Sequence, residues 1–193
     1  MKIKICGLKA KQDIDIVNTY LPDYVGFVFV PSSRRYITID QALELKLMLK
    51  SSIKTVGVFQ NADKKDIKKA INLGIIDVIQ LHGEEDQNYI DSIKSFGCQV
   101  IKAYKIKNKI PAFLISDYIL LDSLAAGSGQ SFDWKKIEFD LENTFLAGGI
   151  NLDNIEKAKA YKPYCIDISS GAEKDGIKNE KIIRELIKAV RNG

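Results

Sequence analysis

KIKICG, residues 2–7, is an alternating strand that ends on a thiol, with Gly7 placed to let the backbone turn directly after it. Seven more apolar runs follow, each with a polar residue or a glycine at or just beyond its end. One of them, Ile119–Leu121, runs into Asp122. At the ends of two parallel strands, Cys6 and Asp122 can face each other across one pocket, as a base and an acid for proton transfer.

The eight runs predict a buried parallel sheet, because most of them are β-branched or aromatic and apolar on both faces. Their ends recur at the spacing of one strand plus one helix. The predicted strands are Lys2–Cys6, Tyr24–Phe29, Thr55–Phe59, Val78–Leu81, Val100–Tyr104, Tyr118–Asp122, Thr144–Ala147 and Cys165–Ser169.

Several segments between these strands have helical patterns, and two of them end at a glycine, Gly74 or Gly97, which is a helix C-cap signal. Strand followed by helix, eight times, predicts a closed (β/α)8 TIM barrel of the α/β class. An open doubly wound sheet is the alternative. The fifth helix is expected to be reduced, because the connection Lys105–Asp117 is short and contains Pro111. The predicted helices are Asp40–Lys50, Lys64–Asn72, Asp86–Phe96, one that opens at Asn151–Asn154, and Asn179–Val190.

The composition is that of a globular protein, with 193 residues, 46% hydrophobic and 28% charged. We expect a single catalytic barrel domain over residues 1–193, because no linker or low-complexity segment divides the chain. No apolar run approaches the roughly 20 residues of a membrane helix, and a strand stands where a secretory signal would. A cytoplasmic protein without a membrane partner is therefore expected.

Charge and cysteine content exclude several kinds of site. The formal net charge is +4, and the lysines are spread along the chain, which argues against nucleic-acid binding and favours a small anionic substrate. Cys6, Cys98 and Cys165 have no C-x-x-C spacing, so neither a disulfide framework nor a zinc site is predicted. Cys98 and Cys165 begin strands, and we interpret them as structural. No metal and no cofactor are expected.

Active sites of such barrels lie at the C-terminal ends of the strands, and this rule selects the candidate residues. Cys6 is either a small core residue or a general base whose pKa nearby cations lower. Asp122 is either paired or a general acid, which would need a raised pKa. Asp167 could orient substrate hydroxyls or simply bind the backbone and a lysine. His82 could line the pocket or accept a backbone hydrogen bond.

Anion-binding features follow the last three strands. Glycines let backbone N–H groups approach a phosphate, and barrels often bind phosphate with the loops after strands seven and eight. The Arg34–Arg35 pair follows the second strand and is either a carboxylate clamp or an exposed basic loop. The candidate phosphate-binding residues are Gly127, Gly129, Gly148, Gly149, Ser170 and Gly171.

Taken together, these segments resemble the phosphoribosylanthranilate isomerases of tryptophan biosynthesis. The matching stretches occur in family order over nearly the whole chain. They are KICGL (4–8), GFVFVPSSRRYI (26–37), VGVFQN (56–61), IQLHG (79–83), LLDS (120–123), GSGQSFDW (127–134), LAGGINLDNI (146–155) and DISSGAE (167–173).

The resemblance implies an Amadori rearrangement of N-(5-phosphoribosyl)anthranilate on a TIM barrel, without cofactor or metal, by a monomer or homodimer. It implies that Asp122 is the general acid and Cys6 the general base, and that Arg35 holds the anthranilate carboxylate. By the same resemblance, the main-chain groups of the six candidate residues bind the phosphate, and Asp167 and His82 line the pocket. The loop Ser123–Gln130 is shorter than the family pattern, with Ala126 in place of a glycine.

Three other functions remain open. The isomerase of histidine biosynthesis runs the same rearrangement, but its usual pair is two aspartates, which Cys6 opposes; a substrate-ambiguous enzyme is conceivable. A non-catalytic phosphosugar-binding barrel would bind ligand without turnover. A redox role for Cys6 is weakened by the absence of a second cysteine near it in the sequence.

Overall fold

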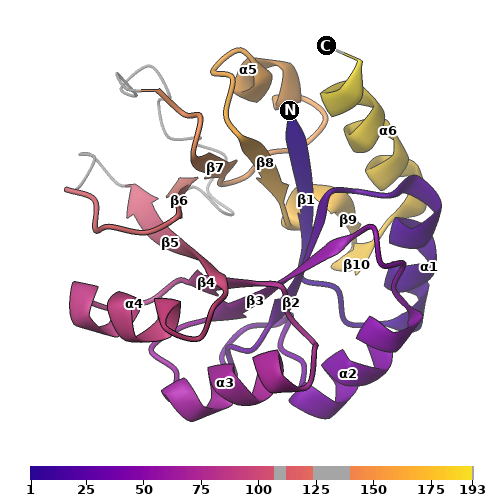
Figure 1. Ribbon diagram of the computed structural model, residues 1–193. Helices are drawn as coiled ribbons and strands as arrows, with labels where there is room; N and C mark the ends of the chain where they lie inside the picture. The colour runs from indigo at the N-terminus through magenta and orange to yellow at the C-terminus, as the bar shows by residue number, and fades with distance from the viewer. Residues whose placement is uncertain (107–111, 124–139, 193) are drawn as a thin grey trace.

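The computed structural model describes residues 1–106, 112–123 and 140–192, and these form a closed barrel with helices around it (Figure 1). The strands pair in sequence order, all parallel, and the last pairs with the first through Ile3 and Ile166. The predicted TIM barrel is therefore confirmed, and the open doubly wound sheet is wrong. The strands are β1 (Lys2–Cys6), β2 (Tyr24–Val28), β3 (Lys54–Phe59), β4 (Val78–Leu81), β5 (Gln99–Ile106), β6 (Tyr118–Ser123), β7 (Thr144–Ala147) and β8 (Cys165–Ile168).

Helices pack around the outside of the sheet, and local caps account for where several of them begin. Thr38 and Gln41 form a capping box at the start of α2, in which each side chain accepts a hydrogen bond from the other's backbone N–H. Asp63 and Asp86 cap α3 and α4 with their carboxylates. The helices are α1 (Lys11–Tyr20), α2 (Ile39–Met48), α3 (Lys64–Asn72), α4 (Gln87–Lys94), α5 (Ile155–Lys159) and α6 (Glu180–Arg191).

Two helix predictions need comment. The helix expected to open at Asn151–Asn154 is wrong in its start, because residues 152–154 form a turn and α5 begins only at Ile155. Asn151 and Asn154 bond each other instead, from the backbone N–H of one to the side-chain oxygen of the other. After β5, residues 112–117 contain no helix, in line with the expected reduction; residues 107–111 lie outside the described part.

The chain closes with a short insertion between β8 and α6. A 3-10 turn, η2 (Ser170–Ala172), leads into the two-residue strands β9 (Glu173–Lys174) and β10 (Ile177–Lys178), which pair antiparallel. This hairpin lies beside the end of the barrel to which the β1 arrow points (Figure 1). It brings Glu173 and Lys178 to the C-terminal ends of β1 and β2.

The apolar core has an outer and an inner part. The outer part lies between the sheet and the helices and includes Ile3 and Ile5 of β1. The inner part fills the barrel, and its floor is an aromatic group in which Phe145 contacts Tyr24, Tyr118 and Tyr164. Because side chains alternate along a strand, Lys4 and Cys6 share the inward face of β1. Among the described residues, no helix is long and apolar enough to cross a membrane.

Candidate active site

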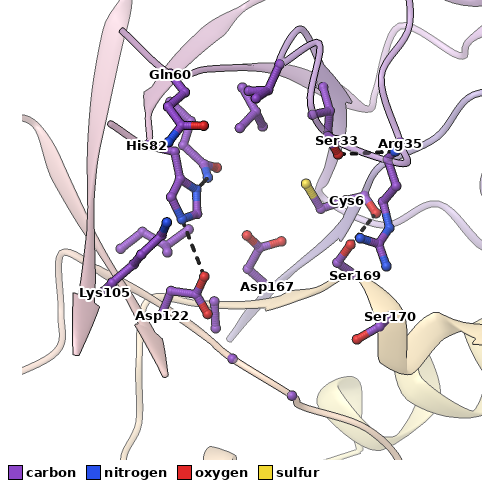
Figure 2. A pocket seen from close by; sticks show the side chains of 18 of the residues that line it. Cys6, Ser33, Arg35, Gln60, His82, Lys105, Asp122, Asp167, Ser169 and Ser170 are labelled. Atoms are coloured by element: carbon purple, nitrogen blue, oxygen red, sulfur yellow. Dashed lines mark hydrogen bonds and ion pairs between the residues drawn. The ribbon is translucent and has the colours of Figure 1, made fainter. Parts of the chain in front are cut away.

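A cavity of about 280 Å³ opens at the C-terminal ends of the strands (Figure 2). Cys6, Arg35 and Ser33 lie on one side of it, and Asp122, His82 and Lys105 lie on the other. The residues that line it are Cys6, Val28, Val30, Ser33, Arg35, Val58, Gln60, Gln80, His82, Lys105, Leu120, Asp122, Ala147, Gly148, Gly149, Ile150, Asp167, Ser169 and Ser170.

The structure therefore brings most of the predicted residues to one cavity. Cys6, Asp122, Arg35, His82 and Asp167 all line it, and so do three of the predicted phosphate-binding residues, Gly148, Gly149 and Ser170. Gly171 does not line it. Gly127 and Gly129 lie outside the described residues, as does the loop from residue 124 to 130 with Ala126.

Cys6 ends β1 with its side chain turned into the cavity and is 8% exposed. Gly26 of the neighbouring strand makes room for the thiol, because a Cβ there would lie 2.6 Å from Sγ. Burial raises the pKa of the Cys6 thiol, and Asp167 adds to the effect, while the ammonium groups of Lys4 and Lys178 oppose it. The resting group is a neutral thiol with two cations near it that favour the thiolate.

Below the cavity, Lys4 is wholly buried in the barrel and forms a short ion pair with Asp167, with 2.8 Å between Nζ and Oδ2. Burial opposes the charge on Lys4, but the Asp167 carboxylate, and Cys6 whenever it is ionised, more than offset this, so the pKa of Lys4 is raised and the ammonium form persists. The other carboxylate oxygen of Asp167, Oδ1, is buried and has no hydrogen-bond partner among the described residues. A buried acceptor without a partner at a cavity wall is suited to a ligand hydroxyl.

His82 and Asp122 form the opposite wall. Asp122 is the last residue but one of β6 and His82 follows β4, and 3.4 Å separates His82 Nε2 from Asp122 Oδ2. Both side chains are partly open to the cavity, at 22% and 27% exposure. His82 Nδ1 lies 3.0 Å from the amide nitrogen of Gln80. The only histidine of the chain thus connects the barrel interior to the carboxylate at the rim.

Arg35 is not an exposed basic residue, because it is held by Glu173 of β9. Its Nε and Nη2 donate to the two carboxylate oxygens at 2.6 and 2.9 Å. Lys178 donates to the same carboxylate at 2.9 Å and to the backbone carbonyl of Ser169 at 3.0 Å. Burial raises the pKa of Glu173, but these hydrogen bonds more than offset it, so the pKa is lowered. Arg34 also reaches Glu173, although most of its side chain is exposed.

The loops after β7 and β8 form the third side of the cavity. Gly148 and Gly149 have φ angles of 96° and 67°, which L side chains rarely adopt. Both glycines line the cavity with backbone rather than with a side chain. Gly171 approaches the backbone of Ile150 so closely that a Cβ would lie 1.9 Å from the Ile150 carbonyl oxygen. Gly171 therefore allows the two loops to approach each other closely at this edge.

Sequence reasoning missed five residues that shape the site: Lys4, Gln80, Lys105, Glu173 and Lys178. Lys4 stands two residues before Cys6 in β1, and Gln80 stands two residues before His82. Because side chains two apart along a strand share a face, strand alternation was the available signal. Lys105 pairs in register with Asp122 and lines the cavity. Within the described ranges, no group of three or more His, Cys, Asp or Glu side chains is arranged to hold a metal ion.

Gly7 has a structural role beside the cavity, and this gives a first prediction. Its φ is +85°, and a Cβ there would lie 2.2 Å from Arg35 Cδ. We expect Gly7→Ala to lower the free energy of unfolding by about 1–2 kcal/mol from the backbone alone, and to raise KM by displacing Arg35. Urea denaturation and steady-state kinetics measure the two effects.

Gly74→Ala is the matched control for Gly7. Its φ is +67°, and nothing lies within 4 Å of where its Cβ would be. Gly74→Ala should lower the free energy of unfolding, because alanine is strained at this positive φ, and it should leave KM unchanged. An unchanged KM in Gly7→Ala would contradict the role given to the contact with Arg35.

Comparison with known proteins identifies a family. Residues 3–189 match the family model described as N-(5'phosphoribosyl)anthranilate (PRA) isomerase. A relative from Thermoanaerobacter pseudethanolicus, named N-(5'-phosphoribosyl)anthranilate isomerase, is 41% identical over 203 residues, which cover 99% of this chain and 98% of the relative.

Solved structures agree with the sequence comparison. A phosphoribosyl anthranilate isomerase from Thermus thermophilus has a TM-score of 0.88 at 29% identity, covering 100% of this chain and 99% of that one. Another isomerase of this name was solved in complex with reduced 1-(o-carboxyphenylamino)-1-deoxyribulose 5-phosphate. It has a TM-score of 0.81 at 29% identity, and the alignment covers 100% of both chains.

Proposed function

This chain belongs to the N-(5'-phosphoribosyl)anthranilate isomerase family, and from that premise we propose that Cys6 is its general base and Asp122 its general acid. The reaction is the isomerisation of N-(5-phosphoribosyl)anthranilate to 1-(2-carboxyphenylamino)-1-deoxyribulose 5-phosphate, a step of tryptophan biosynthesis. The single observation that carries the assignment is that Cys6 and Asp122 stand on opposite sides of one cavity at the C-terminal ends of β1 and β6.

The first step is opening of the ribose ring. Asp122, in its protonated form, gives its proton to the ring oxygen while the bond from that oxygen to C1 breaks. The lone pair of the anthranilate nitrogen forms the C=N bond of a Schiff base. His82 Nε2 lies 3.4 Å from the carboxylate and can hold it in place as it becomes charged.

The second step is removal of the proton from C2. The Cys6 thiolate takes this proton, and the C–H electron pair shifts to form the C1–C2 double bond while the C=N electrons return to nitrogen. The resulting enol tautomerises to the ketone. Lys4 and Lys178 favour the thiolate electrostatically, which supports Cys6 as the base despite its burial.

Binding groups surround these two residues. We assign the phosphate to the backbone of Gly148 and Gly149 together with Ser170, because all three line the cavity and glycine loops with backbone N–H groups suit an anion. Arg35 is assigned to the anthranilate carboxylate; Glu173 fixes its guanidinium and leaves Nη1 without a bond to it. Asp167 Oδ1 is assigned to a sugar hydroxyl, which would satisfy its missing hydrogen bond.

The proposal extends to setting and assembly. We place the enzyme in the cytoplasm, as a monomer or homodimer that acts on a small phosphorylated molecule and binds neither nucleic acid nor membrane. A substrate-ambiguous isomerase that also serves histidine biosynthesis is the second candidate. The observation that favours it is Asp167, which gives the cavity a second carboxylate beside Asp122.

Turnover by the wild-type protein tests the function. We expect the fluorescence of N-(5-phosphoribosyl)anthranilate to disappear in the presence of enzyme, and the aminoimidazole substrate of the histidine pathway to remain unchanged. Turnover of both substrates would establish the ambiguous enzyme. Binding of the first substrate without any turnover would establish a phosphosugar-binding barrel and refute the catalytic assignment.

A further inference from the structure

A chain of hydrogen-bonded side chains runs through the barrel from Lys4 to Asp122, and its central member, Gln80, has no role in the reaction steps above. Lys4 Nζ donates to Gln80 Oε1 at 2.7 Å, and Gln80 Nε2 lies 3.0 Å from His82 Nδ1. His82 Nε2 lies 3.4 Å from Asp122 Oδ2 (Figure 2). Gln80 is 2% exposed and Lys4 is wholly buried, so very little of these two residues is open to solvent.

The direction of each contact is fixed by elementary chemistry. An ammonium group has only donors, so the end of Gln80 that faces Lys4 must be its carbonyl oxygen. The amide nitrogen then faces His82, and an amide NH2 only donates. His82 Nδ1 must therefore accept, and a proton on it would place two N–H groups face to face. The proton of the neutral imidazole is left on Nε2, which faces Asp122.

We propose that Gln80, held by Lys4, is a positioning residue that fixes His82 as the Nε2–H tautomer, so that the imidazole presents a donor to the general acid Asp122. The inference rests on the proposed role of Asp122. A fixed donor holds one carboxylate oxygen and leaves the other for the substrate. We expect the 3.4 Å contact to shorten when substrate binds, because catalytic hydrogen bonds often tighten in the complex.

The sole histidine makes a direct test practical, since 15N-histidine labelling gives one imidazole spectrum for the whole protein. At alkaline pH, where imidazoles are neutral, we expect wild type to show an unprotonated Nδ1 and a protonated Nε2. Gln80→Glu keeps the shape but puts an acceptor against Nδ1. In this variant we expect Nδ1 to carry a proton.

Kinetics should follow the spectrum. We expect Gln80→Glu to lower kcat about 10–100-fold with little change in KM, because the donor to Asp122 is lost or misdirected. In an Asp122→Asn background, Gln80→Glu should lower kcat no further, which shows that Gln80 acts through Asp122. A full additional loss in that background would overturn the proposal.

Gln60→Glu is the matched control for the spectrum. Gln60 lines the same cavity, so this variant adds the same charge there without replacing the group that faces Nδ1. In Gln60→Glu, Nδ1 of His82 should stay unprotonated. Should Gln80→Glu fail to fold, Gln80→Met removes the donor, and its imidazole should show mixed tautomers.

The spectrum decides the inference separately from the function. A protonated Nδ1 in neutral wild type, or an unprotonated Nδ1 in Gln80→Glu, refutes the tautomer assignment even if the enzyme is active. An inactive wild type with the expected spectra refutes the proposed role of Asp122 and leaves the hydrogen-bond chain intact.

Discussion

Asp122→Asn should lower kcat for N-(5-phosphoribosyl)anthranilate by about 10²–10⁴-fold, the range of a lost general acid. Asparagine has nearly the shape of aspartate and can still meet His82, 3.4 Å away, but it has no acidic proton to give the ring oxygen. Because the amide keeps the size of the side chain, KM should change little. Steady-state fluorescence kinetics measure both constants.

Asp117, which directly precedes the same strand, β6, provides the control. Asp117 precedes β6 at the opposite end of the barrel, where its carboxylate accepts from the backbone of Val100 and pairs with Lys94. Asp117→Asn should leave kcat within about twofold, and any effect should appear in the urea midpoint. Equal activity losses in both variants would show that Asp122 acts on stability rather than on chemistry.

The strands could be predicted almost to the residue, because a parallel barrel buries both faces of each strand and leaves long apolar runs in the sequence. Observed and predicted ends agree within two residues. Helices are less well marked. Asp13 organises the start of α1 by accepting from the backbone N–H groups of Lys9 and Ala10, and no serine, threonine or asparagine marks that start. At α5, side-chain bonds of Asn151 and Asn154 build a turn where the pattern indicated a helix.

The candidate site could be predicted where its residues stand at the C-terminal ends of strands, as Cys6 and Asp122 do. The groups behind them were missed. A lysine in an alternating strand is usually interpreted as a solvent-facing residue. In the structure the barrel closes around Lys4, and Asp167 balances its charge. Glu173 and Lys178 come from a two-residue hairpin that periodicity does not indicate. Their partners lie far away in the sequence, and only the folded chain shows them.

Arg35 illustrates this difference. From sequence it is either a clamp or an exposed basic residue, and both alternatives treat it alone. In the structure, Glu173 fixes Nε and Nη2, so the guanidinium has one orientation toward the cavity. Lys178 shares the same carboxylate and bonds the carbonyl of Ser169, whose hydroxyl donates to the carbonyl of Cys6. Arg35 and Cys6, the proposed clamp and the proposed base, are therefore linked through Glu173, Lys178 and Ser169.

Cys6→Ser should lower kcat/KM by about 10²–10⁴-fold, because a serine hydroxyl is far less acidic than a thiol and does not form a comparable base. The pH dependence carries the sharper prediction. Burial raises the pKa of Cys6, so the thiolate is the minor form at neutral pH and its fraction grows as pH rises. The value of kcat/KM in wild type should therefore climb from neutral into alkaline pH, and Cys6→Ser should lack this limb.

Alkylation tests the same thiol without turnover. Iodoacetamide should modify Cys6 faster as pH rises along the same limb, and bound substrate should protect it, as site-resolved mass spectrometry can follow. Cys98 is the internal reference: burial also raises its pKa, but it lies outside the cavity, so substrate should not protect it. Cys98→Ser should keep full activity. Rapid alkylation of Cys6 that substrate does not block, with a flat pH profile, would favour a redox thiol over a base, because a base must lie against the C2 proton and be covered when substrate is bound.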